Sequence, residues 1–505
     1  MVTGVILAAG MSTRMGRFKP MLPIGDQTFI KRIIHMMHLA GIEDIIVVAG
    51  AHKNELEEHL AGEEVRILFN ANYASTQMIE SIRLAIRDVA RSADAIVLTP
   101  ADVALPDDCV YRAVIRMQKE GDCVRPSYGG RGGHPILINK QIFSSILAYA
   151  GDGGLKGALK EAGASIAWAA VGNPGVVMDA DTPEDYQQAL DLLEERKEYI
   201  AVCGGLNVDI GGTPDAKLIP NDSNPGSVRI SLGGVARNCA HNLCLLGRRV
   251  MLFSAYGDDQ YRDLVEQQAD LLGIDLSASM CIGKERTATY LFINGADGNL
   301  EVAVNDMKIC KRLSPEYFSK HLDEINGAKC LMIDANLPEE SIAYLTEHVK
   351  VPIFADMVSE TKAKRMIPYL SKLYAIKPNQ LEAEVLSGIR VTDEDSAKRA
   401  GEAILGMGVS AVFLSEGKGG MLAVTKDGAY QVDACPADPV NMTGAGDAAL
   451  AALIVSLLEG DDPETAAKYA NAAASIAIES ETTVSEKISL QNVKERAGIR
   501  KEDER

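Results

Sequence analysis

The sequence has no excess of basic residues, no long apolar run and no closely spaced cysteine pair. Its 505 residues carry a formal net charge of −19, so nonspecific binding to DNA or RNA is not expected, because such binding needs clustered Lys and Arg. No apolar run approaches the ~18 residues of a membrane span, and residues 1–10 lack the basic start of a signal peptide. We therefore expect a cytoplasmic protein with small-molecule partners.

The nine cysteines are scattered, and without a CxxC pair they predict neither a zinc site nor a redox centre. We expect them to be small core residues or free thiols. With 47% hydrophobic and 24% charged residues, the composition is that of a globular protein. One hydrophobic core does not serve a chain of this length, because cores stop growing near ~250–300 residues. Two or three domains are expected.

The first half alternates apolar strands with helical patterns. Buried strands are predicted at 2–8, 44–50, 94–99 and 136–138. Helical patterns at 27–40 and 78–90 lie between them. This alternation predicts an α/β unit with a parallel sheet covered by helices on both faces.

The second half begins with a new strand at 199–204, directly after a charged helical segment at 183–197. Further strands are predicted near 250–255, 288–293, 330–334, 352–355, 374–376 and 411–415, with helices between several of them. No internal repeat relates the halves, which favours two different α/β folds. The predicted domains are 1–197 and 198–490, followed by a charged tail at 491–505.

A glycine and two basic residues follow the first strand: Gly10, Arg14 and Lys19. Small residues there let backbone N–H groups approach a triphosphate, and the two cations would neutralise charge as pyrophosphate leaves. The alternative is an ordinary strand-to-helix turn with solvated basic residues. The coincidence of all three after the first strand favours the nucleotide site.

Several motifs of this half resemble the MobA-like nucleotidyltransferases, and most of all their molybdenum-cofactor cytidylyltransferase branch. They are residues 7–19, 100–102, 133–135, 151–155 and 179–183. The resemblance covers about residues 1–195 and implies a Rossmann-like domain that transfers a nucleotide, with CTP as the expected NTP.

Nucleotidyl transfer requires a divalent cation held against the α-phosphate, usually Mg²⁺. Asp102 follows a predicted strand, at the edge where such sheets bind ligands, and is the expected first ligand. The resemblance implies Asp181 as a second ligand. Both aspartates have an alternative interpretation, because each also precedes a sequence suited to a helix start.

In the second half, Gly444, Ala445, Gly446 and Asp447 lead into an apolar helix at 448–458. Glycines at a helix N-terminus expose N–H donors to a phosphoryl group, and an aspartate at the same turn can accept the proton of an attacking hydroxyl. A helix cap would explain Asp447 alone, but not the two glycines. We therefore predict a kinase site with Asp447 as its base.

This segment and the glycine-rich stretches at 204–209 and 233–238 resemble the ribokinase-like PfkB carbohydrate kinases over residues 199–485. The resemblance implies a ribokinase-like α/β domain with a small β lid, and ATP as phosphoryl donor. It also implies that three side chains bind sugar hydroxyls: Asn207, Asp209 and Asn238. Gly233 and Gly234 would let the sugar approach the protein backbone.

The same resemblance implies a nucleotide side of the site. Asn379 and Glu382 match an Asn-x-x-Glu element that organises Mg²⁺ and phosphate through water, and Ser415 and Gly417 match the nucleotide loop. Asn471 would lie on the helix that flanks adenine, although a packing role is the alternative. The family's leading aspartate is replaced by Asn441, which puts any role of that carboxylate in nucleotide or cation positioning in doubt.

Four stretches look like the pseudouridine kinase branch of that family: 224–226, 234–238, 286–290 and 334–338. This implies ATP and pseudouridine as substrates, with 286–290 on a strand near the base, and a homodimer through the lid. Three hypotheses stay open for the whole chain. The halves form a working pair of enzymes, or a molybdopterin cytidylyltransferase is fused to an unrelated sugar kinase, or the first half senses nucleotides without turnover.

Overall fold

The computed structural model describes residues 1–10, 15, 17–73, 77–196, 198–295 and 300–499. The chain divides into two compact units, which are described separately. Unit 1 comprises Met1–Lys197 with Asp270–Gly273, and unit 2 comprises Glu198–Ala269 with Ile274–Arg505. Among the described residues, no helix is long and apolar enough to span a bilayer.

Unit 1 is built on a mixed sheet in the order β10-β7-β9-β6-β1-β4-β5, with β8 beside β7. Its strands are β1 (Val2–Ala8), β4 (Asp44–Ala49), β5 (Arg66–Phe69), β6 (Ala95–Pro100), β7 (Cys123–Tyr128), β8 (Arg131–Gly132), β9 (Ile136–Asn139) and β10 (Ile166–Ala170), and β2 (Pro23–Ile24) with β3 (Gln27–Thr28) forms a separate pair. As expected, β1 is parallel to β4 and β6. In contrast, β9 is antiparallel to β6 and β7, since the connection from β7 is too short for a parallel crossover.

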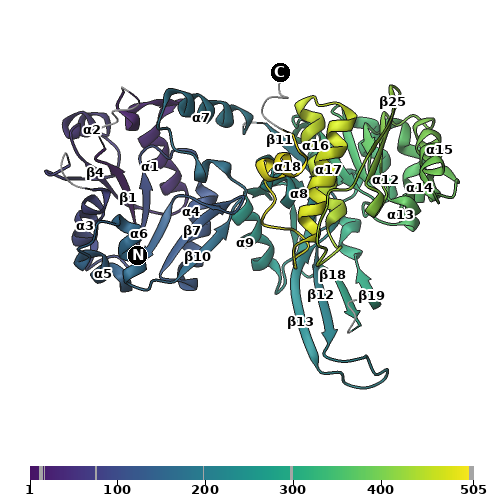
Figure 1. The fold of residues 1–505 in the computed structure, drawn as a ribbon, viewed down its shortest axis with the longest axis horizontal. Coiled ribbons are helices and arrows are strands. Elements are labelled where there is room, and N and C mark those ends of the chain that lie inside the picture. Colours follow the sequence, from purple (N-terminus) through teal and green to yellow (C-terminus); the bar gives the residue numbers. More distant parts are fainter. Residues whose placement is uncertain (11–14, 16, 74–76, 197, 296–299, 500–505) are drawn as a thin grey trace. The chain divides into compact units, whose positions relative to one another are not determined.

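Helices cover both faces of this sheet (Figure 1). They are α1 (Phe29–Leu39), α2 (Lys53–His59), α3 (Met78–Val89), α4 (Asp108–Arg116), α5 (Phe143–Ala148), α6 (Gly154–Glu161) and α7 (Pro183–Glu195). Ile6 of β1 packs in a core with α1 and α4, while Val5 packs in the opposite core with α3 and α5. The continuous apolar run of β1 therefore reflects burial on both faces.

Unit 2 has a larger sheet in the order β16-β14-β11-β20-β21-β22-β23-β24-β25. Its strands are β11 (Tyr199–Cys203), β14 (Arg249–Phe253), β16 (Ile274–Asp275), β20 (Leu331–Asp334), β21 (Ile353–Asp356), β22 (Ala375–Ile376), β23 (Ala411–Ser415), β24 (Met421–Thr425) and β25 (Gly428–Val432). The pairings from β16 to β23 are parallel, and β24 and β25 add an antiparallel edge. A short pair of β15 (Ala255–Gly257) and β17 (Met280–Ile282) lies apart.

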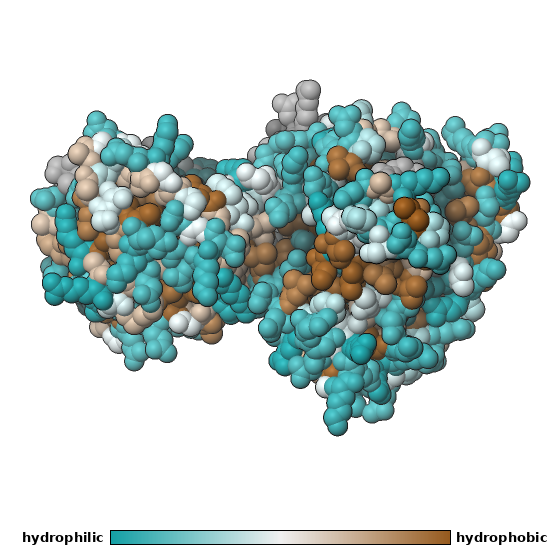
Figure 2. Space-filling view, turned by 90° about the horizontal axis from the view of Figure 1, so that it is seen from below, coloured by the Kyte–Doolittle hydropathy of each residue, from teal (hydrophilic) through white to brown (hydrophobic). Residues whose placement is uncertain are grey.

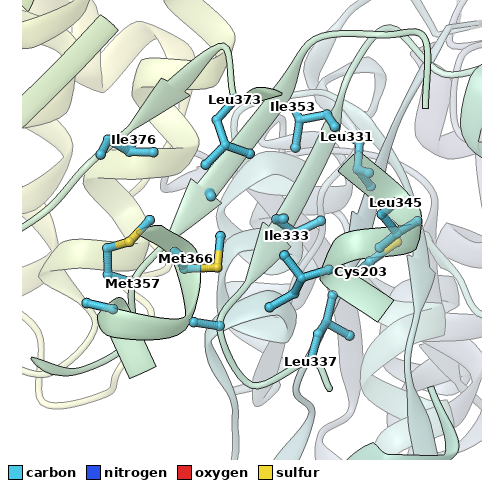
Figure 3. Packing of buried hydrophobic residues seen from close by; sticks show 14 of the residues in the cluster. Cys203, Leu331, Ile333, Leu337, Leu345, Ile353, Met357, Met366, Leu373 and Ile376 are labelled. Atoms are coloured by element: carbon cyan, nitrogen blue, oxygen red, sulfur yellow. The ribbon is translucent and has the colours of Figure 1, made fainter. Parts of the chain in front are cut away.

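The helices of unit 2 are α8 (Val235–Leu245), α9 (Arg262–Leu272), α10 (Pro315–Lys320), α11 (Leu322–Asn326), α12 (Glu339–His348), α13 (Glu360–Met366), α14 (Gln380–Ser387), α15 (Glu394–Leu405), α16 (Ala445–Glu459), α17 (Pro463–Ile478) and α18 (Leu490–Arg496). On one face, Leu331, Ile333 and Ile353 of the sheet pack with Leu345 of α12 and Met366 of α13 (Figure 3). On the other face α8 packs on β11 and β14.

A four-stranded lid extends from unit 2, in the order β13-β12-β18-β19 (Figure 1). Its strands are β12 (Asn207–Pro214), β13 (Gly226–Gly233), β18 (Ala288–Asn294) and β19 (Leu300–Asp306). The strand predicted at 288–293 is therefore a lid strand. This lid is the small β element that the resemblance implied.

Part of the segment predicted as a charged tail forms α18. Ser489 accepts a hydrogen bond from the N–H of Asn492 and caps the helix. Val493 is buried, and Arg496 makes an ion pair of 3.0 Å with Glu479. A buried apolar side chain and an ion pair thus attach α18 to the rest of unit 2.

Candidate active sites

The site of unit 2 lies where strand order reverses, between β11 and β20. Crevices at such points, at the carboxyl ends of the strands, are the usual ligand sites of open α/β sheets. Asp334 ends β20 and accepts hydrogen bonds from the N–H groups of Gly205 (2.9 Å), Ala236 (3.0 Å) and Asn336 (2.8 Å). Burial raises the pKa of this carboxyl group, and these bonds oppose the rise. Asp334 thus joins three segments around the site.

The predicted sugar-binding residues lie together at the base of the lid. Asn207 Nδ2 donates a hydrogen bond of 2.6 Å to Asp209 Oδ1. A Cβ atom at Gly233 would collide with the Asp209 carboxylate, so a glycine is needed there. Gly234 has φ +98° and precedes α8, where a Cβ atom would collide with the carbonyl oxygen of Gly205. Burial raises the pKa of Asp209, and the bond from Asn207 opposes this.

The predicted base is joined directly to a predicted substrate residue. Asn238 Nδ2 donates a hydrogen bond of 2.9 Å to Asp447 Oδ2. The neighbouring Arg237 is buried and donates a bond of 3.0 Å to Asn238 Oδ1, which fixes the orientation of that amide. Burial lowers the pKa of Arg237 to about 10. Residues 209 positions apart in the chain thus form one hydrogen-bonded cluster.

The N-terminus of α16 has the geometry of an anion site. Gly444 has φ +85°, and a Cβ atom on it would overlap the carbonyl oxygen of Thr483. Among the described residues, no side chain caps the helix. The first N–H groups of the helix, from Ala445 to Asp447, are therefore left to bind an external acceptor such as a phosphoryl group.

Asp447 has the electrostatic properties of a general base. Burial raises its pKa to about 8, and the charge of Asp356 adds to the effect. The hydrogen bond from Asn238 and the charge of Lys377 act in the opposite direction. A carboxyl group in this range can exchange a proton near neutral pH, as acid–base catalysis requires.

The predicted nucleotide-side residues form a second group. Asn379 and Glu382 cap α14 reciprocally, because the Asn379 side chain accepts the N–H of Glu382 at 2.9 Å and Glu382 accepts the N–H of Asn379 at 3.0 Å. Asn379 and Ser415 form a parallel β-bridge. Burial raises the pKa of Glu382, and the charge of Asp356 adds to the effect. The reciprocal cap gives this motif a structural role at the start of α14. Asp356 lies close enough for its charge to affect the pKa of Glu382.

Gly417 and Asn471 differ in what surrounds them. Gly417 has φ +59° and an open environment, which suits a loop that a ligand approaches. Asn471 Nδ2 donates bonds of 3.0 Å each to the carbonyl oxygens of Val432 and Asp433. Both amide protons of Asn471 are therefore engaged by backbone at the end of β25, which is the packing alternative considered for this residue.

The site of unit 1 brings three predicted residues together. Lys19 Nζ lies 3.1 Å from Asp102 Oδ2 and also makes an ion pair with Asp181. Burial opposes the charge on Lys19, but its hydrogen bonds and ion pairs with Asp181 and Asp102 outweigh burial and raise its pKa. The loops after β6 and before α7 are thus joined through one ammonium group.

A cavity of about 210 Å³ opens beside these groups. It is lined by Leu7, Ala8, Ala9, Gly10, Lys19, Pro20, Asn70, Tyr73, Gln77, Met78, Ser81, Pro100, Ala101 and Asp102. Its floor lies at the carboxyl ends of β1 and β6, where strand order reverses. Arg14 lies outside the described residues.

Two carboxylates fit Mg²⁺, since that ion is commonly bound through one or two carboxylates with substrate phosphates and water completing its shell. Among the described residues, there is no cluster of three or more His, Cys, Asp or Glu side chains that could hold a metal by itself. An ion at Asp102 and Asp181 would therefore depend on the nucleotide for its remaining ligands.

Comparison with known proteins identifies both units. Residues 197–488 match the pfkB family carbohydrate kinases. The chain belongs to that family. Residues 4–166 match the MobA-like NTP transferase domain. The protein is thus a kinase joined to a nucleotidyltransferase domain, and it uses ATP in one unit and a nucleotide in the other.

Three relatives of the pfkB unit illustrate the similarity. The pseudouridine kinase of Escherichia coli is 34% identical over 59% of this chain and 96% of its own length. A carbohydrate kinase from Agrobacterium tumefaciens is 26% identical with a TM-score of 0.53, covering 60% of this chain and 97% of that one. A ribokinase of Arabidopsis thaliana, solved with ribose and ATP, is 20% identical with a TM-score of 0.53 and covers 59% of this chain and 98% of its own, which shows the shared fold.

The pfkB site contains charged residues that were not predicted as site residues: Asp334, Asp356 and Lys377. Asp334 and Asp356 are the last residues of the adjacent parallel strands β20 and β21. An aspartate at the end of an apolar strand is therefore the signal that could have found them, much as the position just after a strand indicates Asp102. Lys377 directly follows the short strand β22 and has no local motif of its own that indicates a site residue.

Proposed function

We propose that the pfkB unit phosphorylates the 5′-hydroxyl of pseudouridine or a related ribonucleoside. The similarity to a pseudouridine kinase over 96% of that protein's length supports this substrate class. The cluster of Asn207, Asp209 and Asn238 offers donors and acceptors for ribose hydroxyls.

The observation that favours a nucleoside over a free sugar is an aromatic pair on the lid. Tyr290 is paired in register with Asp209, and directly opposed residues share one face of a sheet. Tyr290 and Phe292 have ring centroids 5.4 Å apart, and the Phe292 ring lies over Gly211. Two neighbouring aromatic rings, tilted by 31° to each other, therefore adjoin the proposed ribose-binding residues, where a nucleobase would lie.

The reaction follows from the residues around Asp447. The carboxylate accepts the proton of the 5′-hydroxyl while its oxygen forms a bond to the γ-phosphorus of ATP. The bond from that phosphorus to the bridging oxygen breaks, and ADP leaves with the electron pair. The N–H groups at the start of α16 stabilise charge on the phosphoryl oxygens. Mg²⁺ bound to the nucleotide near Asn379 and Glu382 would supply further charge neutralisation.

A substrate panel tests this assignment. ADP production is measured with ATP and, separately, pseudouridine, uridine, guanosine, inosine and ribose. We expect the highest kcat/KM with a ribonucleoside, and a higher kcat/KM for ribose than for every nucleoside would reject the proposal.

Tyr290→Ala probes the aromatic surface directly. Base stacking on an aromatic ring contributes about 1–3 kcal/mol, so KM for the nucleoside should rise roughly 5- to 150-fold while kcat/KM for ribose stays within about twofold. Tyr430→Ala, on the edge hairpin, serves as a control. An equal effect of Tyr290→Ala on both substrates would contradict a role in binding the base.

For unit 1 we propose a Mg²⁺-dependent nucleotidyltransferase that prefers CTP. Support comes from Lys19, Asp102 and Asp181 beside a cavity lined by Gly10, and from the resemblance to the cytidylyltransferase branch. Release of pyrophosphate from each NTP, with and without molybdopterin, distinguishes a molybdopterin cytidylyltransferase from other acceptors. NTP binding without any pyrophosphate release would instead indicate a sensing module.

The two activities would act in sequence if the kinase product is the acceptor of the transferase. A mixture of protein, ATP, CTP and pseudouridine would then release pyrophosphate only after ADP appears. Pyrophosphate that forms equally well without pseudouridine would exclude this order.

We further propose that the pfkB unit forms a homodimer through the outer face of the lid. Ile230, Ile210, Leu291 and Val304 are aligned across the four strands and share the face opposite to Asp209. Ile230 is 56% exposed and Val304 is 64% exposed. Figure 2, seen from the side toward which the lid points in Figure 1, shows hydrophobic residues gathered on this unit. A second copy can cover such a face symmetrically.

Sedimentation equilibrium tests the dimer. The wild-type protein should be dimeric at micromolar concentration, and Ile230→Glu with Val304→Glu should be monomeric, whereas Lys398→Glu on α15 should change nothing. A monomeric wild-type protein would refute the proposal.

A further inference from the structure

Lys377 is a buried cation directly after β22, and its charge acts on three carboxyl groups of the kinase unit: Asp356, Glu382 and Asp447. Its side chain is only 5% exposed. Its ammonium lies 3.8 Å from Asp356 Oδ2, which is an ion-pair contact but longer than a hydrogen bond. In the described part of the chain, no hydrogen bond from this ammonium is found. A buried ammonium with unused donors is costly unless an anion is to be bound.

The ammonium faces the anion site of α16. A Cβ atom built on Gly446 would lie 3.4 Å from Lys377 Nζ. Gly446 is the second residue of the helix, so the ammonium lies beside the first turn of α16, whose N–H groups no described side chain caps. The charge of Lys377 also lowers the pKa of both Asp447 and Glu382, although burial dominates at each. The cation is therefore close enough to act on both the base and the nucleotide-side motif.

A strained turn fixes the partner of this lysine. Asp356 Oδ1 accepts the N–H of Val358 at 2.8 Å. Val358 has φ +66°, which a β-branched residue rarely adopts. Such strain persists where the surrounding structure requires it, and it is often found at functional sites. Asp356 is thus held in the orientation in which it retains Lys377.

We propose that Lys377 binds the γ-phosphoryl group of ATP during transfer and that Asp356 is its positioning residue. When the alcohol oxygen bonds to the γ-phosphorus and the bond to ADP breaks, negative charge spreads over the phosphoryl oxygens and the leaving oxygen. The ammonium stabilises this charge together with the N–H groups of Ala445 and Gly446, and it transfers no proton. The inference rests on the kinase activity, and it holds for any alcohol acceptor.

The first test replaces Lys377 by methionine in the full chain. Loss of one such charged donor should lower kcat about 10²- to 10³-fold. Affinity for a nonhydrolysable ATP analogue should weaken at least tenfold, while affinity for ADP, which lacks the γ-phosphoryl group, should change less than threefold. The control Lys398→Met, at an exposed position of α15, should leave all three values unchanged. Equal weakening for ADP and the analogue would overturn the proposal.

A double variant separates catalysis from packing. Lys377→Met alone leaves Asp356 as an unpaired buried charge, so its Tm should fall. Adding Asp356→Asn removes that charge and should restore Tm but not kcat. If kcat returned with Tm, Lys377 would be only the structural partner of Asp356, and the proposal would be wrong. The ligand-binding comparison does not depend on the acceptor, so it remains decisive even if pseudouridine is not the substrate.

Discussion

At the scale of single residues, Asp447 shows how burial prepares a base at a cost in stability. Its pKa of about 8 in the folded protein lies above the value of 3.8 for an unperturbed aspartate. The folded state therefore binds more protons than the unfolded state between these values, and its stability decreases as pH rises from about 4 through about 8. Catalysis requires the opposite form, so kcat/KM should increase with pH through about 8.

Asp447→Asn should remove the base and, with it, the loss of stability at high pH. We expect kcat to fall about 10²- to 10⁴-fold, because the proton acceptor is lost. The amide keeps the shape of the side chain and carries no charge, so Tm should exceed that of the wild type at pH 9 and differ less at pH 5. Glu402→Gln, at an exposed position of α15, is the matched control for removal of one carboxylate. Thermal unfolding at both pH values checks the sign, and a variant less stable than wild type at pH 9 would refute it.

Lys19 occupies a comparable position in unit 1, since its ammonium lies between Asp102 and Asp181. Lys19→Met removes this cation and leaves two carboxylates facing each other, so a divalent ion should replace it. We expect Mn²⁺ to bind at least tenfold more tightly to this variant in the absence of nucleotide, measured by electron paramagnetic resonance. Lys160→Met, exposed on α6, is the control. Unchanged Mn²⁺ affinity would mean that Lys19 does not compete with a divalent ion for these two carboxylates.

At the scale of elements, the glycine that begins α16 is required by two constraints. Gly444 and Gly460, at the two ends of the helix, have φ +85° and φ +89°, but only Gly444 has a neighbouring backbone oxygen in the way of a Cβ atom. Gly460→Ala should therefore cost only about 1–2 kcal/mol, the penalty of the left-handed conformation, and retain kcat. Gly444→Ala should destabilise more and reduce kcat, because the helix start must shift. Equal effects in urea unfolding and turnover would contradict this account.

The same scale shows what the sequence could predict. Apolar runs predicted β1, β4, β6, β11, β20, β21, β22 and β23 within one or two residues at most boundaries, because strands buried on both faces are apolar throughout. The orientation of β9 was not predictable from its composition, since it depends on the short connection from β7. Strand β13 was missed although Val228, Ile230 and Leu232 alternate with polar residues, which is the pattern of a strand with one apolar face.

The candidate sites also combine residues that local motifs predict with contacts that only the folded chain shows. Glycines next to charged residues predicted Gly10, Lys19 and the segment from Gly444 to Asp447, because those motifs are local in sequence. The bond between Asn238 and Asp447 and the placement of Lys377 beside Gly446 arise from packing between distant segments. Such contacts have no local signature, so only the folded structure could show them.

At the scale of the whole molecule, each unit has its own sheet and its own hydrophobic cores, and each candidate site is built from residues of one unit. The two activities should therefore be separable by single substitutions in the full chain. Asp102→Ala should abolish Mg²⁺-dependent release of pyrophosphate and leave ADP production within about twofold of wild type. Asp447→Asn should abolish ADP production and leave release of pyrophosphate within about twofold of wild type, since Asp447 lies in unit 2.

The measurement is a pair of assays on each variant, one for pyrophosphate and one for ADP, with Glu402→Gln as the shared control. A metal ligand and a proton acceptor contribute several kcal/mol to their own reactions, so each loss should exceed 10²-fold where it occurs. If Asp102→Ala lowered kcat of the kinase as strongly as it lowered nucleotidyl transfer, while Tm stayed constant, the two sites would be coupled. Independent sites would then be the wrong description of this chain.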